Sequence, residues 1–163
     1  MINDLTHGRI REHPTLLLCI DGGCEPNPGG VVACAWVIYD ANKRVLAEES
    51  RIVCDGGERA TNNYAEYCAL GFALKWLRQH EWRGDLTVRG DSQLLINQVA
   101  GKWKCRSSNL IPLRDRIWEY LDALFNCAGV SKPCKFTWIS RDENTYAHKL
   151  IERAYDGYVK HKI

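Results

Sequence analysis

Short apolar runs separated by turn-forming residues open the chain. Residues 15–20 (TLLLCI) have the length of a buried strand, and the Gly- and Pro-rich segment 22–30 predicts a turn after it. Two further runs, at 31–39 and 44–54, are joined by a short polar link, which favours a hairpin. We therefore predict three antiparallel strands at the start of the domain.

Helical periodicity replaces this pattern at residue 62. Apolar residues recur at three- and four-residue spacing through 62–80, and Thr61 or Asn62 is a candidate cap. The remaining pattern predicts, in order, a strand at 86–89, helices at 92–99 and 109–125, a strand at 135–139 and a helix at 144–160.

This order of elements predicts an α/β fold. Five strands form a mixed sheet whose first three members are antiparallel, and helices flank the sheet. A chain of 163 residues fits one domain of ordinary size. We expect a single domain at 15–163, preceded by a loose polar leader at 1–14.

Composition narrows the class of protein. No stretch approaches the ~18 to 20 consecutive apolar residues of a membrane span, and the leader lacks the apolar segment of a secretory signal. The eight cysteines show neither Cys-x-x-Cys pairs nor zinc-finger spacing to histidine. These features favour reduced thiols in a cytoplasmic protein, with no membrane partner.

The chain is only mildly basic, with a net charge of +2 and a pI of about 8.1. The positive side chains are densest in one stretch that also contains Trp103: Lys102, Lys104, Arg106, Arg114 and Arg116. Charge alone favours a solvated surface here, because most charge runs are solvated. The alternative is a nucleic-acid surface, on which Trp103 would stack.

Three acids occupy positions that suit a metal site. Asp21 follows the first apolar run, Glu66 lies one turn into the first long helix, and Asp91 follows the fourth strand. Ligands gather at the carboxyl ends of strands in α/β sheets, and converging carboxylates repel one another unless a cation lies among them. Each acid taken alone is better explained as a turn, a cap or a surface charge.

The residues around these acids are more specific than the acids themselves. Asp21-Gly22-Gly23 is followed by Asn27-Pro28-Gly29, Thr61-Asn62-Asn63 by Ala65-Glu66, and Asp91-Ser92-Gln93 by Gly101-Lys102-Trp103-Lys104. Over roughly residues 16–155 the chain resembles ribonuclease H of type 1. The short segment 101–110 and the lack of a histidine-bearing loop before the last helix resemble the compact form of that family. The resemblance implies the ribonuclease H-like fold and metal-dependent, two-metal hydrolysis of the RNA strand of RNA/DNA hybrids.

The resemblance also implies a role for individual residues. Catalysis and binding of two Mg²⁺ or Mn²⁺ ions would fall to Asp21, Glu66 and Asp91, with His148 at the fourth position. A larger set of residues would bind the hybrid, with the protein acting as a monomer. These residues would recognise 2′-hydroxyls and the shape of the hybrid rather than its base sequence. The RNA-strand members of the set would be Asn27, Asn63 and Gln93 together with backbone groups of Gly22, Gly23 and Cys24, and the others Thr61 on a DNA phosphate, Trp103 on a DNA sugar, and the basic Lys104.

His148 is a departure from the family, because an aspartate is expected at that position. We consider three alternatives. The imidazole is a working metal ligand and favours Mn²⁺, since Mg²⁺ prefers oxygen. It is a tolerated replacement that orients water or neighbouring groups. Or it marks a hybrid-binding or regulatory module with weak or no catalysis.

Overall fold

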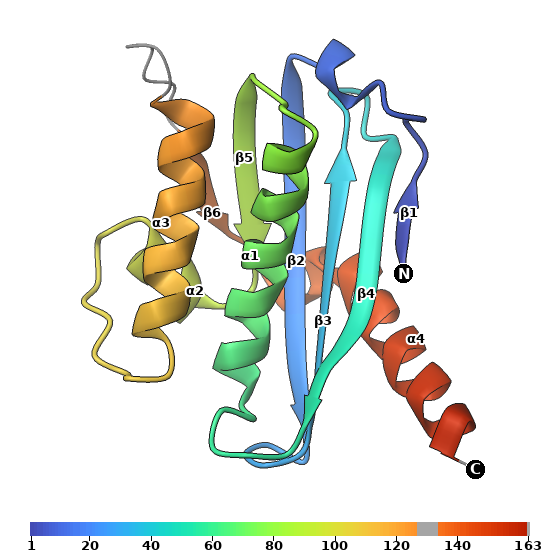
Figure 1. Ribbon diagram of the computed structural model, residues 1–163, viewed down its shortest axis with the longest axis vertical. Coiled ribbons are helices and arrows are strands. Elements are labelled where there is room, and N and C mark those ends of the chain that lie inside the picture. Colours follow the sequence, from blue (N-terminus) through green and yellow to red (C-terminus); the bar gives the residue numbers. More distant parts are fainter. Residues whose placement is uncertain (127–133, 163) are drawn as a thin grey trace.

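The computed structural model of the protein describes residues 1–126 and 134–162 (Figure 1). Its strands are β1 (Ile2–Asp4), β2 (Thr15–Glu25), β3 (Val31–Tyr39), β4 (Val45–Asp55), β5 (Asp85–Gly90) and β6 (Lys135–Trp138). Its α-helices are α1 (Asn62–Gln79), α2 (Gln93–Val99), α3 (Ile111–Phe125) and α4 (Thr145–Lys162), and short 3-10 helices cover η1 (Ile10–Glu12) and η3 (Arg141–Glu143).

The strands form one mixed sheet in the order β1-β4-β3-β2-β5-β6. Strands β2, β3 and β4 are antiparallel neighbours, whereas β5 pairs in parallel with both β2 and β6. The predicted α/β class and the antiparallel arrangement of the first three predicted strands are therefore confirmed.

The N-terminal segment differs from the loose leader that we expected. β1 pairs antiparallel with β4, with Ile2 opposite Glu49, and the side chain of Ile10 is fully buried in the main core. The sheet thus has six strands where the pattern predicted five. A three-residue edge strand is held by backbone hydrogen bonds to β4, and its sequence, Ile-Asn-Asp, carries no strand-like alternation.

Strand β2 also extends beyond the predicted boundary. Its parallel pairing with β5 stops at Cys19, but its antiparallel pairing with β3 continues to Glu25. The expected turn at 22–30 therefore begins later, and Asp21 lies inside the strand rather than at its end. Gly22 is needed for a different reason, because a Cβ atom there would lie 2.4 Å from the backbone of Ala65 in α1.

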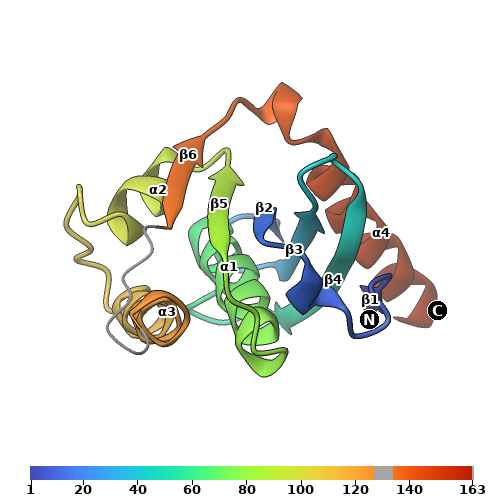
Figure 2. The same cartoon turned by 90° about the horizontal axis from the view of Figure 1, so that it is seen from above.

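Strand β3 is apolar throughout because both of its faces are covered. Cys34, Trp36 and Ile38 face the main core beneath α1 and α3. The alternate residues Ala33, Ala35 and Val37 pack against α4 on the opposite face. Figures 1 and 2 show this three-layer arrangement, with α1 and α3 on one side of the sheet and α4 on the other.

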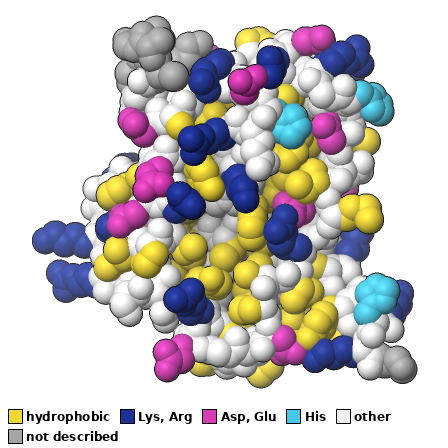
Figure 3. Space-filling view, in the orientation of Figure 1, with side chains coloured by type: hydrophobic (Ala, Val, Ile, Leu, Met, Phe, Trp, Pro, Cys, Tyr) yellow, Lys and Arg dark blue, Asp and Glu magenta, His cyan; other side chains and the backbone are white. Residues whose placement is uncertain are grey.

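The face that carries α1 and α3 combines apolar and basic side chains (Figure 3). Gly71, Phe72, Leu113 and Tyr120 line a groove between these two helices. Within residues 1–126 and 134–162, no helix is long and apolar enough to cross a membrane.

The cysteines in the described part of the chain are free thiols: Cys19, Cys24, Cys34, Cys54, Cys68, Cys105 and Cys134. This agrees with the expectation of reduced thiols. Cys127 lies outside the described residues.

Candidate metal centre and nucleic-acid surface

Three different elements bring the predicted acids together. Asp91 follows directly after β5, and Asp21 lies on the neighbouring strand β2, two residues beyond its last pairing with β5. The close approach of α1 to Gly22 places Glu66, in the first turns of that helix, above the same point of the sheet. Each acid offers one carboxylate oxygen, and these oxygens lie within 4.8 Å of one another.

Two of the three acids are buried and Asp91 is partly buried, so the negative charge of the cluster is costly. Asp21 is 4% exposed and Glu66 is 6% exposed. Burial and the nearby charge of Asp91 raise the pKa of Asp21 above its ordinary value. Burial, followed by the charges of Asp21 and Asp91, raises the pKa of Glu66 well above its ordinary value. Without a cation, the carboxyls therefore resist full ionisation.

One atom of the cluster is left unsatisfied by the protein. The Oε2 atom of Glu66 is buried and has no hydrogen-bond partner among the residues that the structure describes. A buried carboxylate oxygen without a partner is costly, whereas a divalent cation accepts several such oxygens as ligands. The three acids therefore fit a hard divalent ion such as Mg²⁺ or Mn²⁺.

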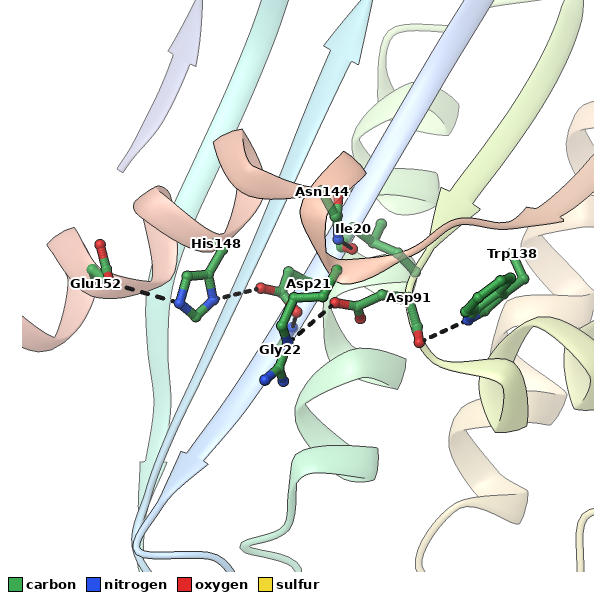
Figure 4. A network of polar contacts seen from close by, with 9 residues as sticks. Ile20, Asp21, Gly22, Asp91, Trp138, Asn144, His148 and Glu152 are labelled. Carbon is green, nitrogen blue, oxygen red and sulfur yellow. Dashed lines mark hydrogen bonds and ion pairs between the residues drawn. The ribbon is translucent and has the colours of Figure 1, made fainter.

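His148 lies next to this cluster and outside its innermost group. It is on the first turn of α4, and its Nδ1 atom is 3.2 Å from Oδ2 of Asp21 (Figure 4). The opposite ring nitrogen, Nε2, is 3.6 Å from Oε1 of Glu152, one helical turn further along α4. The side chain of His148 is 48% exposed, so the imidazole lies at the mouth of the site.

Asn144 fixes the start of α4 against the strand that carries Asp21. Its side chain is buried, and Nδ2 donates a hydrogen bond of 2.8 Å to the carbonyl oxygen of Ile20. The sequence pattern marked Asn144 only as the start of a helix, because the partner is 124 residues away along the chain. Figure 4 shows how this bond places His148 beside Asp21.

Two further residues that the sequence did not single out contact Asp91. The indole nitrogen of Trp138 donates to the carbonyl oxygen of Asp91 at 3.0 Å, and Nε of Arg141 lies 3.8 Å from its carboxylate. Trp138 is the last residue of β6, and Arg141 follows that strand in η3. Strand β6 pairs with β5, the strand that leads to Asp91. The only signal in the sequence was a tryptophan at the end of a short strand.

Each of the predicted RNA-contacting amides lies within six residues of one of the three acids along the chain. The side chains of Asn27, Asn63 and Gln93 are exposed, in the β2–β3 turn, at the start of α1 and at the start of α2. Oδ1 of Asn27 accepts a hydrogen bond of 3.0 Å from the backbone nitrogen of Asn62. This bond ties the β2–β3 turn to the start of α1.

Other members of the predicted set already have partners within the protein. Thr61 caps α1, and its side chain accepts a hydrogen bond from the backbone nitrogen of Tyr64. The thiol of Cys24 is buried, and its backbone nitrogen donates to Oδ1 of Asn62 at 2.7 Å. Gly22 and Gly23 are partly buried within β2, and the nitrogen of Gly22 donates to Asp21. The backbone nitrogens of Gly22 and Cys24, two of the backbone groups expected to contact RNA, therefore already donate within the protein.

The basic segment after α2 is exposed but anchored. Trp103 is 48% exposed, and Lys104 is exposed beside it. The buried side chain of Gln98 donates to the carbonyl oxygen of Lys104 at 3.2 Å, and it accepts from Tyr67 at 2.6 Å. The aromatic ring and the lysine are therefore held on the surface by a fixed backbone.

Comparisons with known proteins place this geometry in context. A family model described as reverse transcriptase-like matches residues 20–154. The bifunctional protein Rv2228c of Mycobacterium tuberculosis is 32% identical over 141 residues, 84% of this chain and 34% of the relative. Ribonuclease HI of Halobacterium salinarum is 33% identical over 139 residues, 83% of this chain and 62% of the relative. The chain thus spans about a third and somewhat under two thirds of these two curated relatives.

Solved structures agree with the sequence relatives. The structure of RNase H1 from Halobacterium salinarum superimposes with a TM-score of 0.75 and 30% identity, covering 88% of this chain and 98% of that one. LC11-RNase H1, solved in complex with an RNA/DNA hybrid, gives a TM-score of 0.77 at 27% identity, covering 88% of this chain and 99% of that one.

Proposed function

This chain belongs to the ribonuclease H type 1 family, and we propose that it hydrolyses the RNA strand of RNA/DNA hybrids with the help of divalent metal ions. The observation that carries the proposal is the group formed by the buried Asp21 and Glu66 and the partly buried Asp91. Its ligand oxygens lie within 4.8 Å of one another, and one oxygen of Glu66 has no partner among the described residues.

The proposed ions are two Mg²⁺ or Mn²⁺ ions in the complex with substrate. When bound, they supply Lewis-acid chemistry that activates a water and stabilises the leaving oxygen of a phosphodiester. Asp21, Glu66 and Asp91 would hold them. His148 would contribute Nδ1, which is the ring nitrogen that faces Asp21. Because imidazole suits Mn²⁺ better than Mg²⁺, we expect Mn²⁺ to be favoured.

The substrate is inferred from the exposed amides around the acids. Asn27, Asn63 and Gln93 each offer a donor and an acceptor, which a 2′-hydroxyl requires. Trp103 and Lys104 offer an aromatic face and a positive charge at a second surface, where the DNA strand would lie. We further propose that the enzyme acts as a monomer.

Replacing Asp91 by Asn tests the proposal. The variant keeps the backbone carbonyl that accepts from Trp138, so the local fold is preserved. It removes one negative ligand, and we expect cleavage of a labelled hybrid to fall by at least about 100-fold, the upper end of losses at perturbed metal sites. Hybrid binding, measured separately by fluorescence anisotropy, should persist.

Asp142→Asn is the matched control, because Asp142 is an exposed acid in η3 near the site and has no place in the acid cluster. Its cleavage rate should equal that of the unmodified chain. Full activity of the Asp91→Asn variant would rule out the proposed role of the cluster.

A further inference from the structure

The imidazole of His148 lies between two carboxylates that approach it from opposite ends. Nδ1 faces Asp21 at 3.2 Å, on the side of the acid cluster. Nε2 faces Glu152 at 3.6 Å, on the side of solvent. Figure 4 shows the three side chains in a line that leads from the buried site to the exposed surface of α4.

This arrangement bears on the protonation state of the ring. A neutral imidazole has one nitrogen with a free lone pair, and its other nitrogen carries a proton. In the ion-free structure Nδ1 is at hydrogen-bonding distance from Asp21, and an ionised Asp21 carboxylate requires the ring proton on Nδ1. If Nδ1 is instead to face a cation held by Asp21, the proton must move to Nε2. The group that receives a hydrogen bond from the second nitrogen of a metal-binding histidine sets both its tautomer and its orientation.

We propose that Glu152 is a positioning residue for His148, holding the proton on Nε2 so that the lone pair of Nδ1 is directed at the metal ion. This inference rests on the proposed function, since it assumes that His148 is a ligand. Glu152 does not belong to the group of acids whose oxygens lie within 4.8 Å of one another. It would therefore act through the imidazole.

The position of Glu152 on α4 separates this role from a structural one. His148 and Glu152 are four residues apart on the same helix, which places their side chains on one face. The side chain of Glu152 is 63% exposed. Replacing it therefore leaves the core beneath α4, formed by Ala147, Leu150 and Ile151, intact.

Mn²⁺ affinity, measured by titration calorimetry on the full chain, tests the inference. Glu152→Ala should weaken Mn²⁺ binding by about 10-fold or more, as loss of an outer partner of a histidine ligand does. Glu152→Gln should restore most of the affinity, because in the ion-bound state its amide oxygen would accept the hydrogen bond from Nε2 that we propose for the carboxylate. Asp156→Ala removes an equal charge from an exposed position one turn further along α4, and should change the affinity little.

A variant that lacks the imidazole tests whether Glu152 acts through His148. In a chain that carries His148→Asp, no ring remains to be oriented, so Glu152→Ala should no longer weaken Mn²⁺ binding. Equal losses in Glu152→Ala and Glu152→Gln, a loss in Asp156→Ala as large as in Glu152→Ala, or a loss that persists beside His148→Asp would each overturn the inference.

The same measurements distinguish this inference from the proposed function. A chain that cleaves hybrids, yet binds Mn²⁺ equally well with and without Glu152, contradicts only the role of Glu152. A chain that binds no Mn²⁺ and cleaves no hybrid contradicts the proposed function, and the inference with it.

Discussion

At the scale of single residues, Glu66 shows most clearly how the fold prepares a cation site. Its carboxyl is buried beside Asp21 and Asp91, and its Oε2 atom lacks a partner among the described residues. Burial and these two charges raise its pKa well above the ordinary value. In the ion-free protein, the Glu66 carboxyl therefore stabilises the folded state while it is protonated and destabilises it once it ionises.

This shift predicts how stability depends on pH. Because the pKa of Glu66 is higher in the folded state, its stabilising contribution is complete below the ordinary glutamate value of about 4.3 and is lost as pH rises toward the folded pKa. Glu66→Gln should therefore raise the melting temperature of the ion-free protein more at pH 8 than at pH 4.5. Thermal unfolding in a chelating buffer measures the difference.

Divalent ions should make the unmodified chain, rather than Glu66→Gln, the more stable of the two proteins. Ions that bind only the folded state stabilise it, by about 2.7 kcal/mol at a concentration of 100 Kd. Mn²⁺ should raise the melting temperature of the unmodified chain more than that of Glu66→Gln. Glu12→Gln, at an exposed position, is the control. Equal pH profiles for Glu66→Gln and the unmodified chain would show that Glu66 is not electrostatically strained.

At the scale of elements, the contact between β2 and α1 brings the acids into range of one another. The helix lies so close to the strand that a Cβ atom on Gly22 would be 2.4 Å from the backbone of Ala65. Asp21 and Glu66 are the neighbours of these two residues along the chain. The spacing of strand and helix therefore determines the spacing of the ligands.

Gly22→Ala tests this contact. The added methyl group must push α1 away from β2, and overpacking of this kind costs typically about 1–3 kcal/mol. We expect that loss in the free energy of unfolding, measured with denaturant, together with weaker Mn²⁺ binding.

Gly71→Ala is the matched control, because Gly71 is in the interior of α1 and a Cβ atom there meets nothing within 4 Å. It should stabilise the protein by up to about 1 kcal/mol through helix propensity. A Gly22→Ala variant that is as stable as the unmodified chain would mean that α1 tolerates a wider spacing.

Elements with strong hydrophobic patterns were predictable, and elements that depend on partners were not. The first and last residues of β3 could be predicted from its continuous apolar run, because a strand that is buried on both faces is apolar along its whole length. The short β1 and the extension of β2 beyond Asp21 depend on backbone pairing with a neighbouring strand. The pattern of apolar and polar side chains does not indicate which backbone segments pair in this way.

The same distinction applies to the candidate site. Asp21, Glu66 and Asp91 were identified because each lies within a distinctive local sequence, and the structure brings them together. No role was predicted for Asn144, Arg141 or Glu152, because their contacts depend on the direction in which α4 and the end of β6 approach the sheet. Long-range placement of this kind requires coordinates.

At the scale of the whole molecule, elements from both sides of the sheet meet at the candidate metal centre. Strand β2, the residue after β5 and helix α1 supply the acids, and α4, on the opposite side of the sheet from α1, supplies the imidazole. Exposed amides lie in the β2–β3 turn and at the starts of α1 and α2, and the anchored Trp103 segment is exposed after α2.

The most direct measurement is cleavage of an RNA/DNA hybrid labelled separately on each strand, in Mg²⁺, in Mn²⁺ and in chelator, beside single-stranded RNA and duplex DNA. We predict that only the RNA strand of the hybrid is cut, that chelator abolishes cleavage, and that Mn²⁺ supports a faster rate than Mg²⁺. Tight binding of the hybrid without cleavage in either metal would contradict the proposed activity and leave a hybrid-binding module in its place.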